Sequence, residues 1–394
     1  MASVIYITRD IERALGRKPV GDYRIITNET PYAIEIKKEF PDNVFLIKKA
    51  EILDTYNLML LSEVEEIIEK YKAEIIVFKN TIHIEKYCIE KEWKILNPSA
   101  ELSERIENKV TGTKWLGELS SLLPPHSTSI VKDAVWNNRP SILQWSHGHT
   151  GEGTILLQNK DDFENIKNKF PYREARITDY IKGPVFTINI VINKEKILFG
   201  NISYQITGIA PFTYNPCSTI GNDWSITHTL LSDAHIEKFL SICNRVAKKM
   251  QDDDWLGLFG IDIIYNEERD ELYLLEINAR QTASVTFESR LQEKVHEDGV
   301  EGLTIFEAHY KALIHESNTG KLIEINDGAQ IIQRWNDNIK DIDENKIIDL
   351  GYKVIKYANT KPNSDFLRIQ SERGIMETHN KFNNRGKDII DILV

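Results

Sequence analysis

The sequence predicts an α/β and α+β protein that is built from three consecutive parts. In the first part, β-branched apolar runs alternate with a helical pattern, which is typical of a mainly parallel sheet. In the middle part, strands follow one another in pairs with short polar or glycine-rich connections, which indicates antiparallel hairpins. A chain of 394 residues is also too long for one ordinary hydrophobic core, so several domains are expected.

Composition narrows the class of protein. Hydrophobic residues make up 41% of the chain and charged residues 28%, which is usual for a water-soluble globular protein. Because no apolar run is long enough to cross a membrane and no N-terminal signal segment is seen, we expect a cytoplasmic protein without a membrane partner. The net charge of -11 argues against a general nucleic-acid surface. The 3 cysteines are widely spaced and indicate neither a disulfide framework nor a zinc site.

Residues 1–107 are predicted to form the parallel α/β domain. Strands are expected over 3–7, 74–78 and 93–96. A helix is expected from Ser62, because Ser62 and Glu65 fit a capping box. No G-x-G-x-x-G follows the first strand, which weighs against a dinucleotide site in this domain.

Residues 108–318 are predicted to form the largest domain. A helix over 108–122 should end at two prolines, and it is followed by strands at 141–145 and 154–157. The connection between these strands contains Gly148, Gly151 and Gly153, which predicts a loop whose backbone N–H groups bind phosphate, although a plain glycine hairpin is the alternative. Further strands are expected over 185–192 and 197–204, with a covering helix from Asp233.

Residues 319–394 are predicted to form a small C-terminal α+β subdomain. Strands are expected over 329–334 and 353–357, with a helix around 343–350 between them. No residue of this part indicates chemistry.

The strongest functional signal is a hairpin that carries carboxylates inside apolar runs. If the turn takes up residues 267–271, Asp262 lies directly across from Glu276, and Asn278 and Arg280 project to the same face. Two carboxylates and an amide oxygen are suited to Mg²⁺ or Mn²⁺, and an arginine fork binds phosphate or carboxylate. The alternative is a surface hairpin with a charged outer face.

The same hairpin resembles the metal-binding signature of the ATP-grasp superfamily, through Gly-Ile-Asp-Ile-Ile at 260–264 and Leu-Glu-Ile-Asn-Ala-Arg at 275–280. The resemblance covers residues 1 to about 316. It implies a pre-ATP-grasp N-terminal domain followed by an ATP-grasp fold of two α+β subdomains. It also implies that Asp262, Glu276 and Asn278 bind magnesium ions that bridge the ATP phosphates. Arg280 is then the catalytic residue that binds the phosphoryl or acyl-phosphate oxygens.

The resemblance extends to the nucleotide site. Lys109 matches a family lysine that approaches the α-phosphate, although a solvated helix lysine is equally compatible. The second family lysine should lie before the glycine-rich loop, where this sequence has Gln144 or Trp145. Asp179, Tyr180 and Ile181 match the segment that reads the adenine edge. No acidic residue for the ribose is seen at 184–186.

The resemblance implies an ATP-dependent ligase that activates a carboxylate as an acyl phosphate for attack by an amine. The substrates are expected to be small molecules or peptide ends, and many relatives are homodimers. No arginine between Arg176 and Arg245 offers a clamp for a second carboxylate, and His228 and the segment 204–224 are candidates for the substrate pocket or for a surface loop. The alternatives are a nucleotide-binding relative without ligase activity and a biotin-carboxylase-like enzyme.

Overall fold

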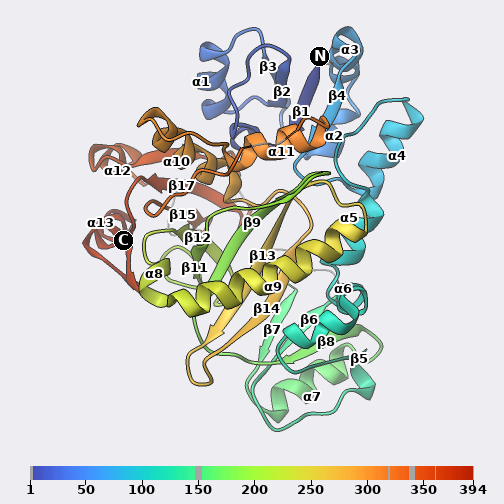
Figure 1. Cartoon of the computed structure of the whole chain (residues 1–394), viewed down its shortest axis with the longest axis vertical. Coiled ribbons are helices and arrows are strands. Elements are labelled where there is room, and N and C mark those ends of the chain that lie inside the picture. The colour runs from blue at the N-terminus through green and yellow to red at the C-terminus, as the bar shows by residue number, and fades with distance from the viewer. Residues whose placement is uncertain (1–2, 147–152, 318–319, 337–341, 360, 394) are drawn as a thin grey trace.

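The computed structural model describes residues 3–146, 153–317, 320–336, 342–359 and 361–393 (Figure 1). The N-terminal region contains a parallel sheet with the strand order β3-β2-β1-β4. Its strands and the helices between and after them are β1 (Val4–Thr8), β2 (Tyr23–Asn28), α1 (Pro31–Glu39), β3 (Val44–Ile47), α2 (Thr55–Met59), α3 (Ser62–Tyr71), β4 (Glu74–Val77), α4 (Ile82–Glu90) and α5 (Ala100–Glu107). The predicted α/β class of this region is confirmed.

Two local predictions in this region are wrong. The residue that precedes α3 is Leu61, so Ser62 is already inside the helix and makes no cap, while Glu65 binds Lys91 and Tyr87 instead. The strand expected over 93–96 is reduced to one bridge between Ile75 and Ile95. The side chain of Asn97, rather than its backbone, pairs with Val77 beside Pro98, and this ends the ladder.

A four-stranded antiparallel sheet follows, with the order β5-β8-β6-β7. Its elements are α6 (Lys109–Leu116), a 3-10 turn (Gly117–Leu122), β5 (His126–Ile130), β6 (Ser141–Trp145), β7 (Thr154–Leu157), α7 (Lys160–Lys169) and β8 (Glu174–Asp179). The hairpin of β6 and β7 is confirmed. The helix expected over 108–122 is shorter, because Gly117 takes a φ of 57° and ends it. One face of this sheet packs Leu143, Trp145 and Ala175 against Phe163 of α7.

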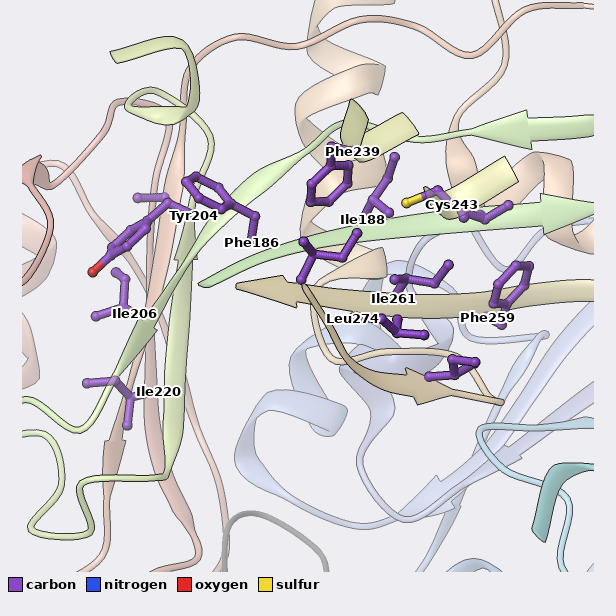
Figure 2. Close-up of a cluster of buried hydrophobic side chains, with 14 of the residues drawn as sticks. Phe186, Ile188, Tyr204, Ile206, Ile220, Phe239, Cys243, Phe259, Ile261 and Leu274 are labelled. Atoms are coloured by element: carbon purple, nitrogen blue, oxygen red, sulfur yellow. The ribbon is translucent and has the colours of Figure 1, made fainter. Parts of the chain in front are cut away.

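The largest sheet has the strand order β14-β13-β9-β11-β12-β15-β17-β16, with β10 paired to β9. Its first strands are β9 (Val185–Ile192), β10 (Ile197–Phe199), β11 (Ser203–Thr207), β12 (Thr219–Asp223), β13 (Gly257–Asn266) and β14 (Glu271–Asn278). The strand expected over 197–204 is therefore split, because β10 and β11 pair with different parts of β9. Helix α9 (Asp233–Asp252) covers the sheet through the apolar face that its sequence predicts, and Figure 2 shows Phe239 and Cys243 of this face near Ile188 and Ile261.

The C-terminal strands continue this sheet. β15 (Ala329–Arg334) pairs with β12, and β17 (Asp365–Ser371) lies between β15 and β16 (Lys353–Lys356). The remaining elements are α8 (Thr227–Leu230), α10 (Val285–Glu297), α11 (Ile305–Leu313), α12 (Glu344–Asp349), β18 (Met376–Thr378), β19 (Lys381–Phe382) and α13 (Asn384–Leu393). The division of the chain at residues 107/108 and 318/319, with an independent C-terminal subdomain over 319–394, stays a prediction.

The N-terminal sheet is anchored to the rest of the chain by aromatic residues. Tyr6 and Tyr23 pack against Phe306 of α11, with ring centroids 6.2 and 6.3 Å apart. An added Cβ on Gly16 would lie 2.4 Å from the Phe306 ring, so the chain approaches α11 too closely for a side chain here.

None of the described helices combines the length and the apolar character that a membrane span requires.

Candidate active site

The hairpin of β13 and β14 carries the predicted carboxylates at matched positions. Asp262 pairs directly with Glu276, and Gly260 pairs with Asn278. The ladder is irregular immediately after Asp262, where the register shifts by one residue. The predicted pairing of Asp262 with Glu276 is therefore confirmed, and both carboxylates line one cavity. The turn itself is one residue shorter than the predicted 267–271, because Glu271 already pairs with Asn266, and the unpaired Leu275 restores the predicted register.

Asp262 is buried and receives two hydrogen bonds. Thr187 Oγ1 of β9 donates to Asp262 Oδ1 at 2.7 Å, and Asn278 Nδ2 donates to Asp262 Oδ2 at 3.2 Å. Burial, with a further contribution from the Glu276 charge, raises the pKa of Asp262 to about 6. The carboxylate is thus held in a place that lacks enough positive charge, which a cation would supply.

Glu276 has a different environment from Asp262. Lys109 Nζ, from the first turn of α6, lies 2.9 Å from Glu276 Oε1. Burial opposes ionisation of Glu276, but the nearby charges of Lys109 and Arg280 outweigh it, so the pKa of this carboxyl is lowered. The role of Lys109 in a nucleotide site stays a prediction, and its side chain reaches Glu276 on the hairpin of β13 and β14.

Arg280 is held by an ion-pair chain that starts in the N-terminal region. Its Nη1 donates to Glu107 at the end of α5, and Glu107 also accepts from Lys79. Burial opposes the charge on Glu107, yet Arg280 and Lys79 together lower the pKa of this carboxyl. The guanidinium of Arg280 is thereby fixed beside the two carboxylates of the hairpin.

Gln144 of β6 is hydrogen-bonded to an arginine on the neighbouring strand. It lies directly across from Arg176 of β8, and Arg176 Nη2 and Nε donate to Gln144 Oε1 at 2.7 and 3.2 Å. Arg176 Nη2 also donates to the backbone oxygen of Leu275 at 3.1 Å, next to Glu276. Burial lowers the pKa of Arg176 to about 10, although the Glu276 charge opposes this. Sequence reasoning missed this arginine because cross-strand pairing is not visible along the chain.

The segment expected to read adenine is fixed by backbone contacts. The N–H groups of Asp179 and Tyr180 donate to the oxygens of Pro125 and Pro140, at 2.8 and 3.0 Å. The Asp179 carboxylate accepts from Asn137 at 3.1 Å and pairs with Arg139 at 3.5 Å. These two side chains contact the Asp179 carboxylate, and Asp179, Tyr180 and Ile181 all line the cavity.

A single cavity of about 620 Å³ joins these parts. Its walls include Gln144, Asp179, Tyr180, Ile181, Asp262, Glu276, Asn278 and Arg280 among the predicted site residues. Lys109 lines an adjoining small recess that shares Glu276 and Arg176 with the cavity. Gly153 lies beside this region and accepts from the Trp145 N–H at 3.0 Å, while Gly148 and Gly151 lie outside the described residues.

The far wall of the cavity contains residues that the sequence did not indicate, namely Arg334 and Asp365 of the C-terminal part and Arg13 of the N-terminal region. The clamp sought between Arg176 and Arg245 therefore has candidates elsewhere in the chain. The segment 204–224 contributes Tyr204, Cys217 and Asn222 to the walls, as one alternative predicted, whereas His228 is not among the lining residues.

The donor set fits a hard divalent cation. Asp262, Glu276 and Asn278 offer two carboxylates and one amide oxygen at one end of the cavity. Among the described residues, no group of three His, Cys, Asp or Glu side chains is placed to form a metal cage. Mg²⁺ usually binds few protein groups and takes its other ligands from water and phosphate, so this small set is adequate.

Comparisons with known proteins agree with this arrangement. A family model described as ATP-grasp domain matches residues 106–284. No curated protein matches the sequence. Among solved structures, N5-carboxyaminoimidazole synthetase from Staphylococcus aureus complexed with ADP is 13% identical, with a TM-score of 0.68, over 100% of this chain and 97% of that chain.

Two further structures have the same fold. N5-carboxyaminoimidazole synthase from Aspergillus clavatus, in complex with ADP and 5-aminoimidazole ribonucleotide, is 14% identical, with a TM-score of 0.68 over 99% of both chains. The biotin carboxylase domain of Hydrogenobacter thermophilus 2-oxoglutarate carboxylase, with MgADP and bicarbonate, is 14% identical, with a TM-score of 0.64 over 95% of this chain and 87% of that chain. Residues 106–284 are therefore an ATP-grasp domain, and the whole chain has the fold of ATP-grasp proteins that carry an N-terminal α/β domain.

Proposed function

We propose that the chain is an ATP-dependent ligase that activates a carboxylate as an acyl phosphate for attack by an amine. The observation that carries this proposal is the pair of opposed carboxylates, Asp262 and Glu276, on the wall of a large cavity beside the fixed cation Arg280. Such an arrangement suits phosphoryl transfer, which depends mainly on positioning and on stabilisation of charge. The match of residues 106–284 to an ATP-grasp domain supports the same chemistry.

Magnesium or manganese would be held by Asp262, Glu276 and Asn278, and would offset the negative charge of the ATP phosphates. The protein prepares this site in two ways. Lys109 keeps Glu276 ionised, while the Asn278 and Thr187 hydrogen bonds orient the Asp262 carboxylate. Lys109 is also near enough to this hairpin to bind a phosphate oxygen of the nucleotide.

In the first step, an oxygen of the substrate carboxylate attacks the γ-phosphorus of ATP, and the bond to the β-phosphate oxygen breaks to release ADP. Arg280 binds the oxygens of the transferred phosphoryl group, and Glu107 keeps its guanidinium in position. In the second step, an amine attacks the acyl carbon, phosphate leaves and the amine loses a proton. No protein nucleophile is required in either step.

The nucleotide is proposed to lie with its adenine at residues 179–181 and its phosphates near the hairpin. Gly183 follows this segment at a φ of 155°, and an added Cβ would lie 1.9 Å from the Tyr265 oxygen. The segment is therefore pressed against the end of β13, which keeps the base and the metal ligands at a fixed separation.

The acid is proposed to bind at the far wall. Arg334 pairs with Asp365, and Arg13 Nη2 lies 3.7 Å from the same carboxylate. The cations that surround Asp365 outweigh the effect of its burial and lower the pKa of this carboxyl. Arg368 also lies 3.7 Å from Asp365, and Arg13 pairs with Glu12 at 3.1 Å, so three arginines face two carboxylates and positive charge is left for a substrate anion. An Arg334→Gln variant should raise KM for the acid without changing the affinity for MgADP, and an unchanged KM would remove Arg334 from the acid site.

A small-molecule acid and amine fit a cavity of about 620 Å³ that must also hold ATP. The similar structures contain 5-aminoimidazole ribonucleotide or bicarbonate, which are ligands of that size class. A peptide end as substrate remains an alternative within the same chemistry.

ADP release should be measured with a panel of acids and amines, with bicarbonate included and with Glu276→Ala as the control. Turnover that needs one acid and one amine, and that Glu276→Ala abolishes, would support the ligase. ADP formation that needs bicarbonate and biotin would favour a biotin-carboxylase-like enzyme. ATP binding without turnover on any pair would favour a nucleotide-binding relative.

A further inference from the structure

We propose that Arg176, on the small sheet formed by β5, β8, β6 and β7, supplies the cation that binds the phosphate chain of the nucleotide. Gln144 of the same sheet is its positioning residue. The inference deepens the proposed function and rests on it. The sequence places no lysine on β6 before the glycine-rich loop, which leaves that wall of the site without an obvious positive charge. The cation lies on the neighbouring strand instead.

The pleat of the sheet brings Arg176 to the cavity. Leu143 and Trp145 of β6 and Ala175 of β8 point to the apolar cluster over α7. Because side chains alternate along a strand, Gln144 and Arg176 project from the opposite face, and both line the cavity. They are direct cross-strand partners, so each limits the conformations of the other.

Gln144 orients Arg176 without cancelling its charge. One amide oxygen accepts from both Nε and Nη2 of the guanidinium, at 3.2 and 2.7 Å. A carboxylate in this position would neutralise the arginine, and a lysine would repel it. Among the described residues, no hydrogen bond or ion pair engages Arg176 Nη1, which leaves this nitrogen for a ligand.

A second contact sets the distance between Arg176 and the metal hairpin. Arg176 Nη2 donates to the Leu275 oxygen at 3.1 Å, and Leu275 precedes Glu276. The guanidinium therefore bridges the small sheet and the hairpin that carries Asp262 and Glu276. A phosphate chain that reaches these carboxylates through a divalent cation passes beside Arg176 on its way to the adenine segment.

The binding of MgADP, measured by isothermal titration calorimetry, tests this assignment. Arg176→Gln should weaken MgADP binding roughly tenfold to hundredfold, because one hydrogen bond to a charged group is lost. The nearly isosteric Gln144→Glu should weaken it as well, because its carboxylate would pair with Arg176. The double variant Gln144→Lys/Arg176→Gln returns a cation to β6 and should recover most of the affinity. Arg173→Gln, on the exposed approach to the same strand, is the matched control.

The outcomes separate this inference from the proposed function. Normal MgADP binding by Arg176→Gln, or failure of the folded double variant to regain affinity, would overturn the role of Arg176 while leaving an ATP site in place. Absence of MgADP binding by the unaltered protein would overturn the proposed function and this inference together. Circular dichroism of each variant confirms that it is folded, and Gln144→Glu tests the charge even if Arg176→Gln does not fold.

Discussion

Asp262→Asn is expected to stabilise the metal-free protein at neutral pH while it removes the magnesium response. In the folded protein the pKa of Asp262 is raised from 3.8 to about 6, chiefly by burial. The stability that its protonated form contributes is complete below pH 3.8 and is lost as the pH rises to about 6. A difference of about two pKa units corresponds to roughly 3 kcal/mol of unfolding free energy.

Asparagine removes this loss and keeps the local hydrogen bonding. Its Oδ1 still accepts from Thr187, and Asn278 can present its own oxygen to the new amide. The stability difference between Asp262→Asn and the unaltered protein should therefore be small near pH 4, increase up to pH 6 and stay constant above it. The full value of about 3 kcal/mol is an upper limit, because a partly hydrated carboxylate loses less on burial.

Urea unfolding at several pH values between 4 and 8, in the presence of EDTA, measures this difference through the transition midpoints. Asp42→Asn, at an exposed position of the N-terminal region, is the control and should show no such trend. Added Mg²⁺ should raise the midpoint of the unaltered protein and not that of Asp262→Asn. A variant that is less stable than the unaltered protein at pH 7, or a difference that does not change with pH, would refute the reasoning.

Three other substitutions test the surroundings of the hairpin. Lys109→Met should raise the pKa of Glu276, because Lys109 is the leading cation that lowers this pKa. The acid limb of the pH profile of ADP formation should therefore shift to higher pH. An unchanged pH profile would contradict this coupling between Lys109 and Glu276. Glu107→Gln should lower the unfolding free energy by about 1.5–3 kcal/mol, because the half-buried cations Arg280 and Lys79 lose their shared charged partner. A loss no larger than that of the exposed control Glu101→Gln would argue against the ion-pair chain. Gly183→Ala should destabilise the protein by about 1–3 kcal/mol in thermal unfolding, because the added Cβ would lie 1.9 Å from the Tyr265 oxygen, and an unchanged unfolding temperature would contradict this close approach.

The features that could be read along the chain are those with a local physical cause. Alternation over 185–192 and the helical apolar face after Asp233 both follow from periodic burial, and both elements form as expected. The pairing of Asp262 with Glu276 was also predicted correctly, although the turn covers 267–270 rather than 267–271 and the unpaired Leu275 makes up the difference of one residue. The capping box predicted at Ser62 was wrong. The helix already begins at Ser62, one residue earlier than a cap by this residue would require.

The features that could not be read depend on segments that are distant in the chain. Lys109 meets Glu276, and Glu107 meets Arg280, only because α5 and α6 pack beside the hairpin. The strand 329–334 read as an ordinary apolar element, although it ends in the cavity-lining Arg334. A weak signal was present, since glutamine and arginine inside a buried strand require partners.

The sequence by itself determined the pairing of Asp262 with Glu276 on a hairpin, the order of the α/β and α+β regions and the resemblance to ATP-grasp proteins, because these depend on side-chain alternation and on contacts between near neighbours. Only the tertiary structure decided which cations serve the site. In the sequence, Gln144 stands where a lysine was expected, so this wall of the site seemed to lack a positive charge. In the structure, Arg176 of β8 lies across from Gln144 and supplies that charge, although it is 32 residues away in the chain. Charge acts through space, so its distribution around a site follows from strand pairing and packing rather than from spacing along the chain.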